Sequence, residues 1–393
     1  QEMAGCDLIV EAIVENLQAK RSLFAELETV VRPDALLASN TSSLIVADIA
    51  AACQRPERVA GLHFFNPVPL MKVAEVIAAV RTAPEVVRAL VALIEGTGHR
   101  AVVAADQPGF LVNHAGRGLY TEGLRLLEEQ VASVAEIDTV LREAAGFRMG
   151  PFELLDLTGL DVSSKVMSSI YEQFNQEPRF RPSALVPPRV AAGLFGRKTG
   201  QGWYTYDGDA PRRAAPRTCP ALPDGLTVWI EPGAAGLGGL RALAQAACAK
   251  LLDVPEAAAL LLLQPWGHDA TRHAAALGLD ATRCVAIDPL PPLDRHRTLM
   301  LTIATSASAR DSALALFTAD GTPATVINDS PGFITQRVLA TIVNIAAQIA
   351  QTGIASVADL EDAVRLGLGY PMGPLNWGDQ IGPARVLAIL QGL

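Results

Sequence analysis

Residues 6–14 read Cys-Asp-Leu-Ile-Val-Glu-Ala-Ile-Val, an apolar and partly β-branched run close to the start of the chain. A continuous apolar run of this kind predicts a buried parallel strand. Residues 16–31 then carry apolar side chains at helical spacing, which predicts an amphipathic helix. A buried strand so close to the first residue lacks neighbours, so we expect the chain to be a fragment that lacks its N-terminal part.

The alternation of strand and helix continues through the first part of the chain. Strands are expected over 35–39, 58–64, 73–77 and 100–104, and a second helix over 84–95. Strands that alternate with helices indicate an α/β domain with a mostly parallel sheet. We assign this domain to residues 1–105.

Beyond residue 105 the apolar period becomes helical, which predicts an all-α domain over 106–206. This domain closes with a basic turn that is punctuated by glycines, at 196–204. Residues 207–225 are rich in Pro, Arg and Ala and are expected to be a linker.

The chain then repeats itself at a constant shift of 223 residues. The segments 108–110, 132–135 and 149–151 recur at 331–333, 355–358 and 372–374. A constant shift indicates a duplicated helical domain. We therefore expect a degenerate second α/β unit over 226–327 and a second helical domain over 328–393. Residue 393 corresponds to position 170 of the first copy, so the second copy is expected to be truncated.

Composition excludes several classes of protein. The 32 basic and 41 acidic residues give a net charge of −9, which argues against nucleic acid or an anionic membrane as the main partner. No apolar run approaches the roughly 20 residues of a membrane span, and no signal peptide opens the chain. The five cysteines form no C-x-x-C pair, which favours free thiols in a reducing cytoplasm. We expect no metal site.

Among the six histidines, His63 ends a predicted strand in the stretch 61–67, GLHFFNP. In α/β sheets, ligand-facing groups lie beyond the carboxyl ends of the strands, although the position also suits a structural histidine. Glu75 stands among apolar residues on the next predicted strand, where a buried carboxylate needs a partner. A carboxylate that orients an imidazole is the arrangement of a general base. The alternative is an ion pair of Glu75 with Lys72 or Arg81.

Four further polar residues are candidates with structural alternatives. Ser42 lies in a polar turn after a strand, where a serine taken alone is more often a helix N-cap. Asn113 falls near the start of a helix, where its amide would either point into a cleft or cap the helix. Glu15 and Lys20 flank the end of the first strand, and the alternative for them is an exposed pair on a solvated surface.

Six ordered motifs resemble those of the L-3-hydroxyacyl-CoA dehydrogenases. They are DLIVEAIVEN at 7–16, SNTSS at 39–43, GLHFFNPVP at 61–69, PGFLVN at 108–113, MGPFE at 149–153 and GRKTG at 196–200. The resemblance covers about residues 1–206 and implies a Rossmann-like, NAD-binding fold for residues 1–105. The duplicated helical domain is similar to the longer bacterial branch of the family, which acts on 3-hydroxybutyryl-CoA or 3-hydroxyadipyl-CoA.

The resemblance implies an NAD-dependent enzyme that oxidises an acyl-CoA substrate, in fatty-acid β-oxidation or phenylacetate catabolism. It implies that His63 removes the proton of the 3-hydroxyl group and that Glu75 orients His63. It implies that Ser42 and Asn113 hold the reacting oxygen and the thioester end. The positions that match NAD contacts in the family are Glu15, Lys20, Ser42, Asn66 and Lys198.

The second copy lacks this set of residues. At the shift of 223, Glu75 falls on Thr298 and Asn113 on Gln336, while His63 falls on Ala286 or, with a small gap, on Ile287 or Asp288. We interpret the second copy as a structural half. Helical domains pair between subunits in the family, so we expect either a homo-oligomer or intrachain pairing of the two helical domains.

Two other functions stay open at this point. The chain would be a catalytically silent relative if the first copy had lost its site residues, but it keeps His63, Glu75, Ser42 and Asn113. A hydroxy-acid or sugar-acid dehydrogenase that needs no CoA would also keep the base. The family's glycine-rich loop is expected to precede residue 1, so we expect the chain as given to be inactive.

Overall fold

The computed structural model describes residues 2–208, 210–212 and 219–393, so part of the predicted linker lies outside the described residues. The chain forms two compact units. The first unit comprises Gln1–Arg117, Ser164–Pro182 and Ile342–Trp377, and the second comprises Gly118–Ser163, Ser183–Thr341 and Gly378–Leu393. These units differ from the predicted domains, because segments of both helical copies pack with the first sheet.

The first unit contains a five-stranded sheet of order β1-β2-β3-β4-β5. The strands are β1 (Leu8–Glu11), β2 (Leu36–Ser39), β3 (Val59–Phe64), β4 (Val73–Ala78) and β5 (Arg100–Ala105). Neighbouring strands are parallel except β3 and β4, which are antiparallel. The prediction for the first strand was wrong in extent and burial: β1 ends at Glu11 and Val14 is 69% exposed. The reason is that the chain turns after Glu11, whose carboxylate accepts a hydrogen bond from the amide of Ile13 at 2.6 Å.

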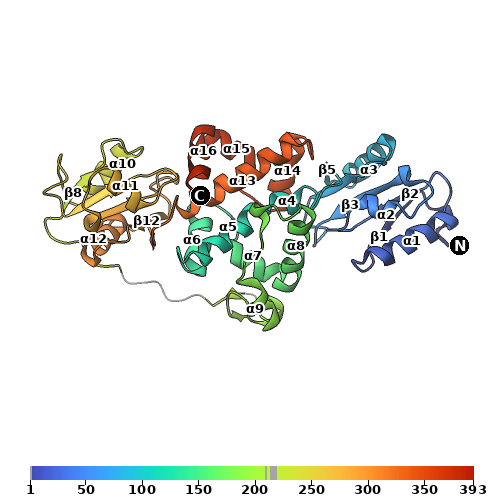
Figure 1. Ribbon diagram of the computed structural model, residues 1–393, viewed down its shortest axis with the longest axis horizontal. Helices are drawn as coiled ribbons and strands as arrows, with labels where there is room; N and C mark the ends of the chain where they lie inside the picture. The colour runs from blue at the N-terminus through green and yellow to red at the C-terminus, as the bar shows by residue number, and fades with distance from the viewer. Residues whose placement is uncertain (1, 209, 213–218) are drawn as a thin grey trace. The chain divides into compact units, whose positions relative to one another are not determined.

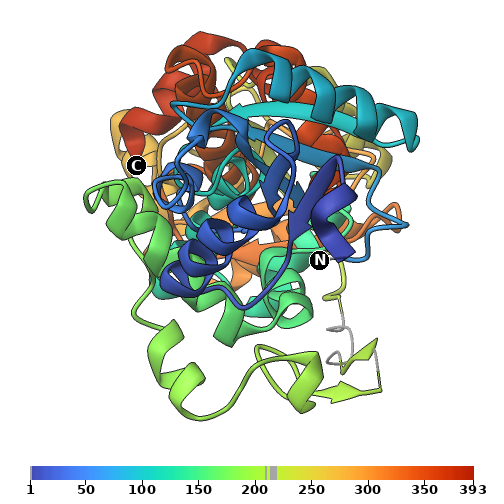
Figure 2. The ribbon, with the colours of Figure 1, turned by 90° about the vertical axis from the view of Figure 1, so that its right-hand side faces the viewer.

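Helices cover both faces of this sheet (Figure 2). One face packs against α1 (Leu17–Val30) and α2 (Val46–Ala50), and the other against α3 (Pro84–Gly96). The start of α1 is set by Asn16, whose side-chain oxygen accepts a hydrogen bond from the amide of Ala19 at 2.9 Å, as expected of an N-cap.

Two helices of the first helical copy recur in the second, and Figure 1 labels the helices of both copies. The first copy contains α4 (Val112–Ala115), α5 (Arg117–Glu128), α6 (Val134–Glu143), α7 (Pro151–Thr158), α8 (Leu160–Gln173) and α9 (Val186–Ala191). The second contains α13 (Ile334–Gln351), α14 (Val357–Gly367), α15 (Pro374–Ile381) and α16 (Pro383–Gly392). At the predicted shift, α6 recurs as α14 and α7 as α15. Within the described ranges, no helix combines the length and apolarity needed to cross a membrane.

A second α/β region lies between the helical copies in the sequence. Its sheet has the order β13-β12-β11-β10-β8-β9. The elements are β8 (Thr227–Ile230), α10 (Leu237–Ala246), β9 (Lys250–Leu251), β10 (Leu260–Leu263), α11 (Ala270–Ala276), β11 (Cys284–Ile287), β12 (Arg297–Leu301), α12 (Ala307–Thr318) and β13 (Ala324–Ile327). Here β11 and β12 are the antiparallel pair, in the place that β3 and β4 hold in the first sheet.

Each α/β region is joined to the helical copy that is remote from it in sequence. In the first unit, the amide of Ala105 donates to the carbonyl of Ile354 at 2.8 Å. In the second unit, the amide of Asn328 donates to the carbonyl of Val131 at 2.9 Å. Asn328 lies 223 residues after Ala105, and Ile354 lies 223 residues after Val131. The same backbone contact is therefore made twice.

A buried arginine links the helical copies within the second unit. Arg337 on α13 is 3% exposed, and its guanidinium lies 2.7 Å from Glu122 on α5 and 2.6 Å from Glu129. Glu122 is itself buried, and Arg125 is its further partner at 3.3 Å. Because breaking a buried pair leaves an uncompensated charge, this contact should matter more than a surface ion pair.

We predict that Arg337→Ala lowers the free energy of unfolding by about 3 kcal/mol, because it leaves the carboxylate of Glu122 buried with less compensation. Arg310→Ala is the control, since Arg310 and Asp311 form an exposed pair of the kind worth about 1 kcal/mol or less. Urea unfolding followed by circular dichroism measures both. Equal losses in the two variants would show that the pairing does not carry stability.

Candidate active site

His63 and Glu75 meet because of the register of two strands. In the antiparallel β3–β4 pair, His63 lies directly opposite Glu75. The Nδ1 atom of His63 is 2.6 Å from Oε2 of Glu75, and the two residues are 6% and 0% exposed. The structure therefore brings together the two residues that the sequence singled out.

The other carboxylate oxygen of Glu75 is held by the backbone. Its Oε1 atom accepts hydrogen bonds from the amides of Leu111 at 2.9 Å and Val112 at 2.8 Å. The turn that aims these amides contains two residues of positive φ in succession, Gly109 at 74° and Phe110 at 50°. A positive φ is uncommon for a bulky residue and concentrates at functional sites.

The alternative partners of Glu75 are wrong. Both oxygens of this carboxylate are engaged by His63 and by the amides before α4, so Glu75 is not the partner of Lys72 or Arg81. The strand register decides this, because it faces Glu75 towards β3 at the position of His63.

Ser42 and Asn113 lie next to each other, and neither caps a helix. The side-chain amide of Asn113 donates to the backbone carbonyl of Ser42 at 3.5 Å, a long hydrogen bond. Asn113 lies inside α4, and α2 begins only at Val46. The capping alternatives are therefore wrong for both residues.

Glu15 organises the polar turn that contains Ser42. Its Oε1 atom accepts hydrogen bonds from Thr41 Oγ1 at 2.6 Å, from the Ser42 amide at 3.0 Å and from the Ser43 amide at 3.1 Å. Burial acts to raise the pKa of Glu15, but these hydrogen bonds and the charge of Lys20 bring the pKa below its ordinary value of 4.5. Glu15 is thus an anchored carboxylate at the edge of the site.

Lys20 is not an exposed surface residue, so that alternative is wrong. It is 1% exposed, and its Nζ atom lies 2.6 Å from Glu11 Oε1 and 3.4 Å from Glu15 Oε2. The reason is that the first turn of α1 packs behind the end of β1, where two carboxylates converge on the ammonium group. The same Glu11 accepts a hydrogen bond from Ser39 at 2.7 Å.

The sequence argument missed Glu11 and Asp106. The sequence does contain a signal for Glu11: like Glu75, it is a carboxylate within an apolar predicted strand. Asp106 follows β5 and accepts hydrogen bonds from the amides of Val46 and Ala47, at 2.9 and 2.7 Å. No local sequence pattern predicts that α2 is capped by a residue so distant in sequence.

The remaining two predicted cofactor contacts lie in different units. Asn66 follows β3 and is exposed. Lys198 belongs to the second unit, where its Nζ atom lies 2.5 Å from Asp161 Oδ1. Across the part of the chain that the structure describes, no group of three or more His, Cys, Asp or Glu residues is arranged to hold a metal ion.

The second copy has a closed polar network at the corresponding place. Ile287 pairs with Leu299, and the next residue, Asp288, donates its amide to Thr298. Asp288 is therefore the counterpart of His63. Its carboxylate accepts hydrogen bonds from Thr335 and, at 3.0 Å, from Gln336, while burial raises its pKa to about 6.

We predict that Glu15→Gln weakens the protein by about 1 kcal/mol at neutral pH, because hydrogen bonds to a charged acceptor become neutral ones. The pKa of Glu15 is lowered on folding, so its stabilisation is present above the unfolded pKa and is lost as the pH falls through the folded value. Urea unfolding at several pH values measures this. A difference between the wild type and Glu15→Gln that did not shrink below about pH 4.5 would contradict the assignment.

Family models match most of the chain. The model described as 3-hydroxyacyl-CoA dehydrogenase, NAD binding domain, matches residues 1–107. The model described as 3-hydroxyacyl-CoA dehydrogenase, C-terminal domain, matches residues 109–206 and again residues 332–393. The second of these models therefore covers both helical copies.

Individual proteins agree with this assignment. A 3-hydroxyadipyl-CoA dehydrogenase of Escherichia coli K12 is 39% identical over an alignment of 396 positions, which covers 100% of this chain and 77% of that protein. The mitochondrial hydroxyacyl-coenzyme A dehydrogenase of Sus scrofa is 44% identical over 200 residues, 51% of this chain and 64% of that enzyme. None of these matches supports the prediction that the chain is cut at its ends.

A solved structure matches the whole chain. The 3-hydroxybutyryl-CoA dehydrogenase of Escherichia coli K12 superposes with a TM-score of 0.85 at 38% identity, covering 100% of this chain and 78% of that one. The chain is therefore a member of the 3-hydroxyacyl-CoA dehydrogenase family, an oxidoreductase with a Rossmann-like NAD-binding domain followed by the helical domain of that family.

Proposed function

We propose that the protein oxidises the 3-hydroxyl group of an L-3-hydroxyacyl-CoA to a 3-oxo group with NAD, and that the His63–Glu75 pair is its general base. The observation that carries this proposal is the 2.6 Å contact between His63 Nδ1 and Glu75 Oε2 at a buried position. A carboxylate at Nδ1 leaves Nε2 as the nitrogen that meets the substrate. No hydrogen bond to Nε2 is recorded within the described ranges.

The residues around the ends of β2 and β3 suit a dinucleotide. Ser42 and Asn66 offer a hydroxyl and an amide just beyond these strand ends, the side of an α/β sheet where such cofactors bind. When bound, NAD accepts the hydride that leaves C3 of the substrate. Lys20 is held by Glu11 and Glu15, so we propose that it acts on the cofactor site by orienting Glu15. Lys198 stays a proposed contact from the helical domain.

The role of the His–Glu pair follows from its hydrogen bonds. His63 takes the hydroxyl proton at Nε2 as the C3–H bond breaks, and it becomes an imidazolium. Glu75 holds Nδ1–H and stabilises that charge, since an anionic partner favours the protonated ring. The two amides on Glu75 keep its carboxylate in one orientation. We propose that Ser42 and Asn113 bind the reacting oxygen and the thioester end.

The second half of the chain would serve assembly in this proposal. The contacts of Arg337 with Glu122 and of Ala105 with Ile354 support pairing of the two halves within one chain. We propose that this intrachain pairing replaces pairing between subunits. All five cysteines are free thiols. The cytoplasmic location stays a prediction, as does the place in β-oxidation or phenylacetate catabolism.

We predict that His63→Gln in the full-length protein lowers kcat by about 10²–10⁴-fold, the usual effect of losing a general base. The measurement is NADH consumption, by absorbance, with acetoacetyl-CoA. 3-Hydroxybutyryl-CoA, 3-hydroxyadipyl-CoA and a hydroxy acid without CoA are compared in the oxidative direction. Near-normal turnover in the variant would overturn the assignment of His63. If the wild type oxidised only the CoA-free acid, the proposal that the substrate is an acyl-CoA would be overturned.

We predict that Glu75→Gln also lowers kcat, by about 10²–10⁴-fold, while the KM for NADH changes little. A glutamine amide donates a hydrogen bond to Nδ1. This favours the tautomer of His63 that carries its proton on Nε2, so Nε2 can no longer accept the proton of the substrate. Glu28→Gln is the matched control, because Glu28 likewise accepts hydrogen bonds from two backbone amides, those of Gln54 and Arg55. A variant at Glu75 that raised only the KM for NADH would contradict the orienting role.

A further inference from the structure

A helix of the second helical copy is clamped onto the first sheet. In the first unit, Arg100 on β5 lies 2.6 Å from Asp359 and 2.9 Å from Asp362, both on α14. The amide of Ala105 at the other end of β5 donates to Ile354 at 2.8 Å, just before α14 begins. Figure 1 shows α14 beside α4 and β5. The degenerate half thus supplies a layer to the sheet that carries His63 and Glu75.

The C-terminal end of α14 reaches the backbone that holds Glu75. A Cβ atom built on Gly367 would lie 3.2 Å from Val112 Cγ2 and 3.4 Å from Val73 Cγ1. A Cβ atom built on Gly116 would lie 3.3 Å from the side chain of Leu368. The first of these distances is tighter than ordinary van der Waals contact, so a methyl group on Gly367 would push the side chain of Val112 away by a few tenths of an ångström.

Both neighbours of Gly367 are linked to Glu75, Val112 by a hydrogen bond and Val73 along strand β4. Val112 donates its amide to Glu75 Oε1 at 2.8 Å, and the next residue is Asn113. Val73 lies two residues before Glu75 on β4. A displacement of Val112 therefore moves an amide donor of Glu75 and the side chain of Asn113 together.

We propose that Gly367 and Leu368 are positioning residues for the His63–Glu75 pair, which act through α4. The second helical copy then does more than assemble the protein: its helix α14 sets the distance between the amide donors and the carboxylate that orients the base. This inference rests on the proposed function, because it assigns a role in the same reaction.

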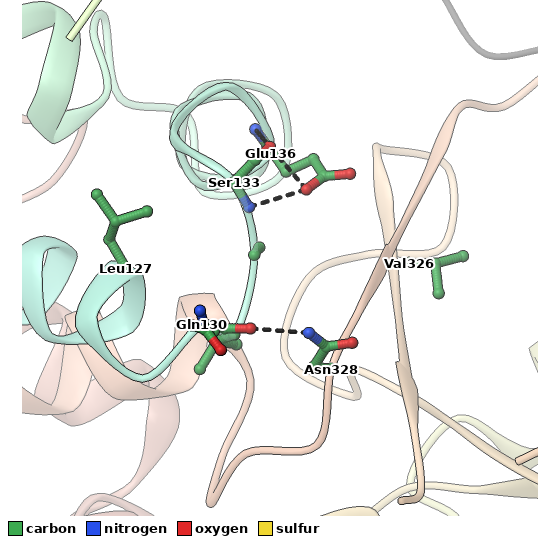
Figure 3. Close-up of a pocket in the computed structure, with 8 residues that line it drawn as sticks. Leu127, Gln130, Ser133, Glu136, Val326 and Asn328 are labelled. Carbon is green, nitrogen blue, oxygen red and sulfur yellow. Dashed lines mark hydrogen bonds between the residues drawn. The ribbon is translucent and has the colours of Figure 1, made fainter.

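The corresponding place in the second unit keeps the backbone hydrogen bond, from Asn328 to Val131, but the arginine is replaced there. At the shift of 223, Pro323 stands where Arg100 stands, and Glu136 where Asp359 stands. Glu136 accepts a hydrogen bond from Ser133 at the start of its own helix. A cavity of about 390 Å³ lies there, lined by Leu127, Gln130, Ser133, Glu136, Val326 and Asn328 among others (Figure 3). The arginine ion pairs are present in the half that has the His–Glu pair, and a cavity lies at the corresponding place in the other half.

Gly367→Ala tests the proposal, with Gly96→Ala as its matched control. Each glycine is the last residue of a helix in the first unit, but a Cβ atom on Gly96 meets nothing within 4 Å. We expect Gly367→Ala to lower kcat for acetoacetyl-CoA reduction by about 10-fold, since misplacement by 1 Å costs up to about 10²-fold. The KM values for NADH and acetoacetyl-CoA should stay within about 2-fold, and Gly96→Ala should leave kcat unchanged.

A second substitution separates a local push from general damage. Val112→Ala removes the methyl groups that a Cβ atom on Gly367 would meet, but it keeps the amide that Glu75 accepts. We therefore expect kcat of the Gly367→Ala, Val112→Ala double variant to recover to within about 3-fold of Val112→Ala alone, a coupling typical of residues in contact. If the fold-loss of kcat in the double variant equalled the product of the losses in the two single variants, the proposed contact would be refuted.

The remaining outcomes are decided as follows. Equal kcat in Gly367→Ala and Gly96→Ala, in an active wild type, overturns the positioning role and leaves the proposed function standing. No activity in the folded wild type instead overturns the proposed function. If Gly367→Ala does not fold, Arg100→Ala releases α14 from the β5 side and should lower kcat several-fold. Equal kcat in Arg100→Ala and the surface control Arg310→Ala would then overturn the inference.

Discussion

The carboxylate of Glu75 is the group on which the arrangement of the first unit depends. A buried charge is very unfavourable unless it is paired and hydrogen-bonded, and Glu75 is fully buried. Three donors compensate it: the imidazole of His63 and the amides of Leu111 and Val112. They come from β3 and from the turn before α4. The requirement to satisfy this one group therefore joins the strand that carries the base to the helix that carries Asn113.

The turn before α4 shows the conformational cost of this arrangement. Phe110 adopts a φ of 50° directly after Gly109 at 74°, which aims two successive amides at the carboxylate. In the second copy Gly332 keeps a φ of 69°. Phe333, unlike Phe110, does not adopt a positive φ. Thr298 stands there in place of Glu75. The unusual backbone thus accompanies the buried carboxylate and not the PGF motif alone, as expected where strain is tied to function.

Duplication let the two halves diverge in different directions. The helices α14 and α15 repeat α6 and α7 because helix packing constrains apolar positions in both halves. At the site, Asp288, Thr335 and Gln336 form a closed network of hydrogen bonds in the second copy. Such a network stabilises buried polar groups by engaging them with one another. The helix α14 of the second half also contributes to the first unit, through Arg100.

The sequence by itself determined the alternation of strands and helices, the duplication at a shift of 223 and the candidates His63 and Glu75, because each leaves a local or periodic pattern. Tertiary structure decided the rest. The β3–β4 register placed His63 against Glu75 and excluded Lys72 and Arg81 as partners of that carboxylate. Packing of α1 behind β1 buried Lys20, and Asp106 capped α2 from a distant position. These contacts join residues far apart in the chain, so which polar groups satisfy one another is settled only when the elements pack.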